Sequence, residues 1–402
     1  MTKARIGIRS LGHESDASAG FPGLIEVIRQ FTPNWYTATM GTGVLALALN
    51  QFPASVPGLR SVAVALWLAN IGLFAVFTLL YAARWVLFFH GARRIFDHSV
   101  MSMFFGAVPM GLATIVNGFL AFGPPLMGGA AVGVATVLWW VDVALSLACG
   151  LFIPYLMFTR QEHRMEQMTA VWLLPIVAAE VAAVSGALLV PHLPSSQAFA
   201  VLVVGYALWA YSVPLALSIL VLLVLRLVLH KLPTRDLGVS AWLALGPIGT
   251  GALGLLLLGG EAPAAFTANG LPGVGEVAFA VGLIGGVVLW GYGIWWLAVA
   301  VLKTVRYLRE GLPFNLGWWG FTFPPGVYAL ATLALARVTH LALFAMVGEA
   351  LVVCLAGFWL LVASRTAHGA WRGTLFVAPC LQGDAAPLHC DTAPLHCAAD
   401  MV

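Results

Sequence analysis

Long apolar runs, each closed by a short polar segment, fill the chain from Pro33 to Ser364. A run of about 20 apolar residues is long enough to cross the hydrocarbon core of a bilayer as a helix. We count ten such runs, at residues 33–52, 61–83, 99–122, 131–159, 169–190, 197–225, 239–259, 276–302, 317–337 and 341–364. The pattern therefore predicts an all-α polytopic membrane protein with ten transmembrane helices.

The composition excludes a soluble fold. Of the 402 residues, 61% are hydrophobic and 9% are charged, whereas a soluble domain carries roughly 25% charged residues. So few charged side chains cannot cover a water-facing surface. The short linkers between the runs leave no room for a second soluble domain.

Three regions follow from this pattern. We expect residues 1–30 to form a cytoplasmic head that ends in a short interfacial helix, because Leu24, Ile25 and Ile28 fall on one helical face. Residues 31–365 form the transmembrane domain, and residues 366–402 a disordered cytoplasmic tail. The tail repeats Ala-Pro-Leu-His-Cys at 386–390 and 393–397. That spacing matches no zinc pattern, so we expect no metal there.

Basic residues fix the orientation. They precede the first run and follow every even-numbered run, whereas the other side has only Arg60 and Arg337. Because basic loops stay in the cytoplasm, both termini are expected there. The basic residues on the cytoplasmic side are Lys3, Arg5, Arg9, Arg29, Arg84, Arg93, Arg94, Arg160, Arg164, Arg226, Lys231, Arg235, Lys303, Arg306, Arg309, Arg365 and Arg372.

The odd-numbered and even-numbered runs differ in kind. The odd runs are rich in glycine and proline, whereas most even runs are oilier. Small residues let helices approach closely, and broken helices are tolerated beside a lumen. We therefore expect five helical hairpins whose odd helices form an inner pore ring, although proline is also simply more frequent in membrane helices. The breaks are Gly41-Thr42-Gly43, Pro109-Met110-Gly111, Pro175, Gly246-Pro247-Ile248-Gly249 and Pro324-Pro325-Gly326.

The ninth run contains the sharpest break. Phe323 stands directly before Pro324 and Pro325, and proline removes a backbone donor and clashes with the preceding turn. A bulky Phe at a break that lines a lumen is a candidate pore gate. The alternative is that Phe323 only packs within a kinked helix.

Polar groups at membrane depth offer weak attraction for an anion. Lys and Arg are absent from the centres of the runs, and fixed positive charge there would slow the exit of an anion. Half-helix N-termini and uncharged donors are a softer alternative. Each hydroxyl has an alternative role as a donor to its own helix backbone. The candidate donors are Thr37, Thr39, Thr42, Thr114, Thr322 and Asn117.

Three acids lie within apolar runs: Asp142, Glu180 and Glu349. An ionisable group inside a membrane is a functional hypothesis by default. Glu180 is on an odd run shortly after Pro175, and it is a candidate for carrying a coupled proton. Its alternative role is a hydrogen-bonded tie between helices. Asp142 and Glu349 are on even runs and are expected to be structural or subunit-interface ties.

Enzyme classes find little support. All ten histidines lie in tails, loops or the ends of runs, where they cannot hold a haem at mid-membrane. The sequence contains no HExxH motif, no phosphate-binding loop that ends in Gly-Lys-Ser/Thr and no paired intramembrane aspartates. We therefore expect no enzyme activity, no cofactor and no nucleic-acid partner. A receptor or scaffold is a further alternative, but such a protein does not need a lumen lined by broken helices that carry polar residues.

Several motifs, in order along successive odd runs, resemble the tellurite-resistance/dicarboxylate transporter family, which includes the slow anion channels. The motifs are Phe31-Thr32-Pro33-Asn34-Trp35, Met40-Gly41-Thr42-Gly43, His98-Ser99, Gly106, Pro109-Met110-Gly111, Asn117-Gly118, Trp172-Leu173-Leu174-Pro175, Leu245-Gly246-Pro247-Ile248-Gly249, Trp318-Trp319 and Phe323-Pro324. The resemblance runs from about Phe31 to Ser364.

The resemblance implies a ten-helix plasma-membrane protein that assembles as a homotrimer with one pore in each subunit. It implies a Phe on the ninth helix that plugs the pore, which is Phe323 by position in the motif. The doubled proline departs from the family pattern and makes Phe321 the second candidate. The Met-Gly-Thr-Gly motif resembles the malate and sulfite branch, so C4-dicarboxylates and sulfite are the expected substrates. Tellurite resistance and a chloride or nitrate channel remain alternatives.

Overall fold

The computed structural model describes residues 23–53 and 55–381. Within those residues the chain is helical and contains no strand. The N-terminal head up to residue 22 and the repeated tail motif lie outside the described residues. The helices are α1 (Leu24–Gln30), α2 (Tyr36–Asn50), α3 (Leu59–Leu87), α4 (Phe89–Arg93), α5 (Ala107–Phe122), α6 (Pro124–Met127), α7 (Ala130–Thr159), α8 (Leu174–Leu189), α9 (Ser195–His230), α10 (Leu245–Thr267), α11 (Pro272–Glu310), α12 (Phe323–Thr339) and α13 (Ala342–Trp371).

Nine helical segments among the described residues are long and apolar enough to span a bilayer, which confirms an all-α polytopic membrane protein. The tenth expected span corresponds to α2, which has 15 residues. It is buried throughout except at Leu49 and Asn50 and packs against α3, α5, α12 and α13. A count of ten spans therefore remains a prediction.

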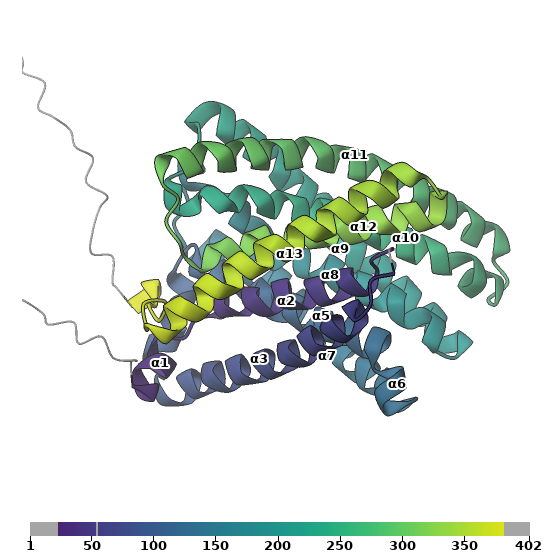
Figure 1. Ribbon diagram of the computed structural model, residues 1–402, viewed down its shortest axis with the longest axis horizontal. Helices are drawn as coiled ribbons and strands as arrows, with labels where there is room; N and C mark the ends of the chain where they lie inside the picture. The colour runs from purple at the N-terminus through teal and green to yellow at the C-terminus, as the bar shows by residue number, and fades with distance from the viewer. Residues whose placement is uncertain (1–22, 54, 382–402) are drawn as a thin grey trace, which may run out of the picture.

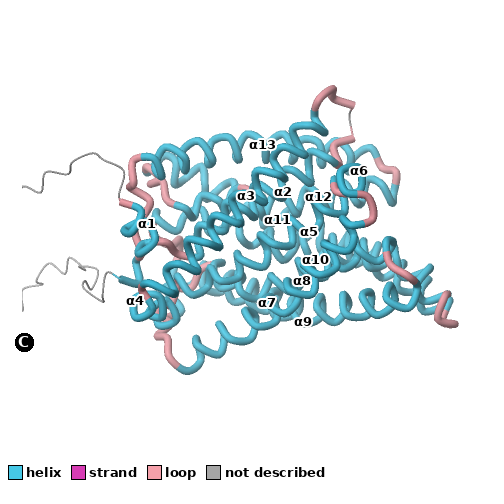
Figure 2. Tube along the Cα trace, turned by 90° about the horizontal axis from the view of Figure 1, so that it is seen from below, coloured by secondary structure: helices cyan, strands magenta, loops and turns pink. Residues whose placement is uncertain are grey.

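The long helices form an inner and an outer set. In the inner segments that contain α5, α8, α10 and α12, 78–94% of the residues in the most apolar stretch are buried. In α3, α7, α9, α11 and α13 the corresponding share is 22–39%. Figure 1 shows α2, α5 and α8 between α3 on one side and α11 on the other. In the view of Figure 2, α13 and α9 lie at opposite edges, with α5, α10 and α12 between them.

Each inner helix begins with a 3₁₀ segment, a feature that the sequence pattern did not predict. These segments lead into α2, α5, α8, α10 and α12, and they are η1 (Pro33–Trp35), η3 (Met101–Gly106), η5 (Ala170–Leu173), η7 (Arg235–Ala244) and η8 (Leu316–Phe321). A 3₁₀ turn is tighter than an α turn and commonly marks a helix end or a strained junction. The outer helices α3, α7, α9, α11 and α13 lack such a start among the described residues.

Indole groups tie the outer set to the inner set. One tryptophan on each of α3, α7, α9 and α11 donates its Nε1–H to the inner helix that comes next in the sequence. The tryptophan on α13 donates to α2, the first inner helix. The pairs are Trp67 to the Ile115 carbonyl (3.3 Å), Trp139 to the Ala182 carbonyl (2.9 Å), Trp209 to the Gly251 carbonyl (2.9 Å), Trp290 to Thr332 Oγ1 (2.9 Å) and Trp359 to Thr42 Oγ1 (3.0 Å). These bonds link neighbouring hairpins and close the bundle into a ring.

The two ends of the described chain meet at the face where the inner helices begin. The main-chain N–H of Ala378 donates to Gln30 Oε1 at 2.8 Å, and the ring of Phe376 stacks on Trp35. The buried guanidinium of Arg84 donates to the Phe31 carbonyl and to Cys380 Sγ. Helix α13 thus runs past the expected boundary at residue 365, and residues 372–381 fold back onto the bundle. Figure 2 shows α1 and α4 at this end and α6 at the other.

Candidate functional site

The five 3₁₀ segments surround a cavity of about 270 Å³, which we call the vestibule. It lies at the end of the bundle where every inner helix begins. Pro379 of the folded-back C-terminal segment also lines it. The remaining lining residues are Asn34, Thr37, Met40, Val100, Met101, Phe104, Val171, Leu174, Asp236, Leu237, Val239, Ser240, Leu243, Asn315, Leu316, Gly317, Trp319, Gly320, Phe323 and Pro324.

The electrostatics of the vestibule come from the backbone rather than from cationic side chains. Among the residues that the structure describes, no Lys or Arg lines it, and Asp236 is the one charged lining residue. Five helix N-termini converge here, and each carries a partial positive charge. Their attraction for an anion is weak enough to permit release, which conduction requires.

A smaller pocket of about 20 Å³, which we call the constriction, shares Met40, Leu174, Leu243, Phe323 and Pro324 with the vestibule. That volume is roughly the room needed for a single water molecule. All five inner helices or their 3₁₀ starts line it. The lining residues are Met40, Met110, Leu173, Leu174, Val177, Leu243, Gly246, Pro247, Phe323 and Pro324.

Phe323 lies between the two spaces and lines both. The backbone switches from 3₁₀ to α at Thr322, where φ is −112° and ψ is −68°, and Pro324 and Pro325 start the α-helix. Among the described residues, the ring of Phe323 stacks on no other aromatic ring.

Phe321 has different surroundings. Its ring contacts Trp242, Trp318 and Phe358 at centroid distances of 5.4–5.6 Å. It lines neither the vestibule nor the constriction. The cluster holds the Phe321 ring away from both spaces, whereas Phe323 lines both; which of the two closes the pore remains a prediction.

The glycines of α2 serve helix packing. A Cβ at Gly41 would lie 2.2 Å from Thr322 Oγ1, and one at Gly43 would lie 2.0 Å from Thr114 Oγ1. Only glycine permits these close approaches of α2 to α12 and to α5. Thr42 between them accepts the hydrogen bond from Trp359. None of these three residues lines the vestibule or the constriction.

Some of the other predicted pore residues line the constriction, and others are buried between helices. Pro247 and Pro324 line the constriction, whereas Pro109, Asn117 and Pro175 are buried in the inner helices without lining either space. Asn117 Oδ1 has no hydrogen-bond partner among the described residues. Whether these residues line the conducting pore remains a prediction.

Four of the five threonine hydroxyls donate to the carbonyl three residues earlier in their own segment. These are Thr37 to Asn34 (2.6 Å), Thr39 to Tyr36 (2.7 Å), Thr114 to Gly111 (2.7 Å) and Thr322 to Trp319 (2.6 Å). These four hydroxyl hydrogens therefore bond to the helix backbone, which is the alternative role given above for such hydroxyls.

Glu180 is fully buried on α8 and faces α9. The Ser212 hydroxyl oxygen lies 2.9 Å from the Ile176 carbonyl oxygen and 3.1 Å from Glu180 Oε2. A single hydroxyl hydrogen serves only one of these oxygens, so both contacts are satisfied when the carboxyl of Glu180 carries a hydrogen of its own. Glu180 lines neither space. Asp142 is likewise buried within this one chain, and neither of its carboxylate oxygens has a partner among the described residues.

The sequence analysis missed several lining residues. Met40 and Met110 line the constriction directly before Gly41 and Gly111, and the shared Met-Gly pair was the available signal. Pro379 lies outside every apolar run, so nothing in the sequence pattern connects it with the pore mouth.

Residues 30–367 match the voltage-dependent anion channel family. The chain is 36% identical over 352 residues to a sulfite efflux pump of Arthroderma otae, which covers 87% of this chain and 93% of that protein. It is 22% identical over 351 residues to a malic acid transport protein of Schizosaccharomyces pombe, which covers 84% and 78% of the two chains. An uncharacterized transporter of Methanocaldococcus jannaschii is 26% identical over 353 residues, 88% of this chain and 97% of that one.

These relatives are transporters, and their similarity extends over almost the whole transmembrane region. The vestibule, the constriction and the ring of inner helices all fall within the matched residues, apart from Pro379. The chain therefore belongs to the voltage-dependent anion channel family and is an integral membrane channel or transporter for anions.

Proposed function

We propose that this protein moves sulfite across the membrane through a pore that Phe323 closes. Sulfite is the first candidate because a relative at 36% identity is a sulfite efflux pump. Malate is the second candidate, since the more distant Schizosaccharomyces pombe relative transports malic acid. Both anions are small, and both suit a pore whose attraction comes from uncharged groups.

One observation carries the proposal: Phe323 lines both the vestibule and the constriction. An anion that enters the vestibule is held by five converging helix N-termini. Rotation of the Phe323 ring away from the constriction then opens the way between the inner helices. Because no Lys or Arg lines the vestibule, the anion is not trapped there.

We further propose that the protein is a plasma-membrane homotrimer with both termini in the cytoplasm. The basic loops support this orientation, and the family resemblance supports the trimer. A mass measurement of the protein in detergent or nanodiscs tests the trimer, and a monomer under all conditions would contradict it. No residue set in the described chain suggests an enzymatic reaction, and we assign none.

Flux measurements in proteoliposomes test the transport function. The purified protein is expected to pass sulfite, and malate more slowly, when either anion is loaded on one side. Chloride serves as the third anion, and protein-free liposomes set the background. Each flux is measured with and without a pH gradient. Failure of all three anions to move above background under either condition would contradict the proposal.

A further inference from the structure

A second and larger cavity lies outside the inner ring. It measures about 1260 Å³ and opens between the end of α9, the start of η7 and the end of α11. We call it the basic cavity. Its lining residues are Leu227, Lys231, Leu232, Pro233, Thr234, Arg235, Asp236, Arg306, Tyr307, Glu310, Gly311, Leu312 and Pro313.

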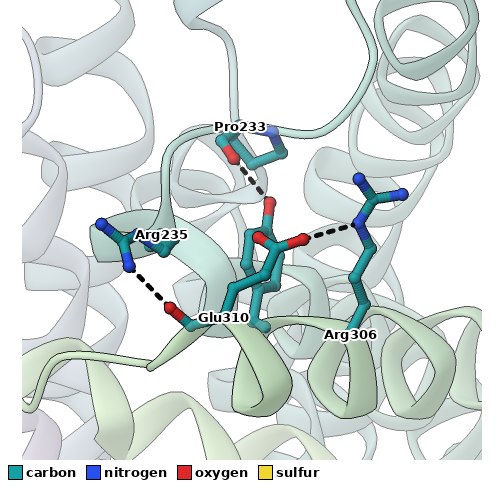
Figure 3. A network of polar contacts seen from close by, with 5 residues as sticks. Pro233, Arg235, Arg306 and Glu310 are labelled. Atoms are coloured by element: carbon teal, nitrogen blue, oxygen red, sulfur yellow. Dashed lines mark hydrogen bonds and ion pairs between the residues drawn. The ribbon is translucent and has the colours of Figure 1, made fainter.

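Hydrogen bonds hold the rim of the basic cavity in place (Figure 3). Arg306 Nε lies 3.1 Å from Glu310 Oε1, and Arg235 Nη1 donates to the main-chain carbonyl of Glu310 at 2.6 Å. The hydroxyl of Tyr307 donates to the Pro233 carbonyl at 2.5 Å. The loop and the end of α11 are thereby joined, so the rim cations are presented by a preformed frame.

Two buried cations lie behind this rim. Arg226 is 4% exposed and Lys303 is 9% exposed. Arg226 donates to the carbonyl of Lys231, which lines the cavity, at 2.6 Å and to the carbonyl of Glu166. Among the described residues neither cation forms an ion pair with a carboxylate, and Lys303 makes no hydrogen bond.

Buried charges of one sign are costly unless an opposite charge compensates for them. Three cations line the cavity, Lys231, Arg235 and Arg306, and the buried Arg226 and Lys303 lie on the same two helices, α9 and α11. The two acids of the cavity are Asp236 and Glu310, and Glu310 is already paired with Arg306. The unbalanced positive charge points to an anionic ligand.

The surroundings indicate the form of that ligand. Val228 and Leu229 on α9 and Leu308 on α11 are 58–63% exposed and stand beside the cavity. Exposed apolar residues at the end of a membrane helix face acyl chains, and basic pockets at this depth suit lipid phosphates. We propose that the basic cavity binds the phosphate headgroup of an anionic lipid whose chains lie along α9 and α11. Asp236 lines both the basic cavity and the vestibule, so the two spaces are neighbours, but the lipid site does not depend on which anion is transported.

Lipid binding to the full-length protein in detergent tests this site. Phosphatidylglycerol is expected to bind and to raise the melting temperature more than phosphatidylcholine does, as measured by native mass spectrometry and thermal unfolding. The double variant Arg235→Gln/Arg306→Gln should weaken phosphatidylglycerol binding about tenfold or more, since each basic residue near a lipid surface contributes appreciably. Arg309→Gln is the matched control, because Arg309 is exposed on the same helix outside the cavity, and it should bind as the parent does.

Two further arms complete the test. Lys303→Met should raise the melting temperature in lipid-free detergent, because it removes an uncompensated buried charge, and should reduce the gain from phosphatidylglycerol. Millimolar inorganic phosphate should stabilise the parent less than the lipid does. Equal stabilisation by free phosphate, equal binding of the two lipids, or equal losses in the double variant and Arg309→Gln would each overturn the proposal.

Discussion

The inner helix α8 and the outer helix α3 are equally apolar, yet their surroundings are opposite. In the segment that contains α8, 94% of the residues in the most apolar stretch are buried, against 22% in α3. Apolarity therefore does not decide which helix is buried within this chain. Small residues contribute, because they permit close helix approach. Proline does not separate the two sets, since Pro154 lies inside α7 and Pro214 inside α9.

The two sets also use their polar groups differently. Inner threonines satisfy their own backbone, whereas outer tryptophans reach across to the neighbouring inner helix. Inner segments also donate outward, because Trp242 donates to Thr304 Oγ1 and Trp319 to Thr366 Oγ1, so hydrogen bonds join the two sets in both directions. Phe323 is buried, and among the described residues its ring is not stacked on another ring.

The largest expected effect comes from a glycine on each set. A Cβ at Gly249 on α10 would lie 2.7 Å from the main-chain nitrogen of Tyr328, whereas one at Gly291 on α11 would have no atom within 4 Å. Gly249→Ala should destabilise the protein by about 1–3 kcal/mol, the usual cost of overpacking, and Gly291→Ala should not. Thermal unfolding in detergent compares the two. Equal melting temperatures would contradict the close contact between α10 and α12 at Gly249.

Two adjacent tryptophans sharpen the comparison at the contact between the sets. Trp139 is fully buried and donates to the Ala182 carbonyl, whereas Trp140 is 48% exposed. Trp139→Phe removes the donor and part of the packed volume, so a loss of about 1–2 kcal/mol is expected. Trp140→Phe should change stability much less. If Trp140→Phe lowers the melting temperature more than Trp139→Phe does in the same assay, the hydrogen bonds from the outer tryptophans do not hold the bundle together.

Glu180 tests whether a buried acid on an inner helix serves transport. We propose that it carries the proton if a pH gradient drives flux, although it faces α9 rather than the pore. Glu180→Gln keeps the shape and the contact with Ser212 but cannot exchange a proton. It should abolish the acceleration by a pH gradient and leave flux down the anion's own gradient intact. A pH-driven flux equal to that of the parent would return Glu180 to a structural role.

The smallest effect concerns the connection between outer α7 and inner α8. Burial lowers the pKa of His163 below its ordinary value of 6.5, and its Nε2 lies 3.0 Å from Gln161 Oε1. His163 therefore binds a proton more readily in the unfolded chain than in the folded protein. Its contribution to the free energy of unfolding is complete above pH 6.5 and is lost as the pH drops below that value. His163→Gln should flatten this dependence in thermal unfolding, and His90→Gln, at an exposed histidine, should not. An unchanged slope in His163→Gln would exclude His163 as its source.

The sequence predicted the bundle better than the pore. Apolar runs outlined the spans, and the proline pair at 324 and 325 lies at the start of α12. The sequence could not show which face of a helix a residue occupies. Gly41 and Thr42, for example, fit a pore wall and a helix contact equally well by pattern. The 3₁₀ starts and the tryptophan hydrogen bonds between helices depend on where distant segments lie in space, which the sequence pattern does not show. The burial of Arg226 and Lys303 was also not predicted, because basic residues near the ends of apolar runs are usually exposed in loops.

The central claim is that Phe323, and not Phe321, closes the pore. Anion flux through Phe323→Ala and Phe321→Ala, compared in proteoliposomes at matched protein density, tests it directly. Phe323→Ala should raise flux about tenfold or more, equivalent to a barrier lower by about 1.4 kcal/mol. Phe321→Ala should lower thermal stability without raising flux. Unchanged flux in a folded Phe323→Ala protein, or a larger rise in Phe321→Ala, would contradict this account.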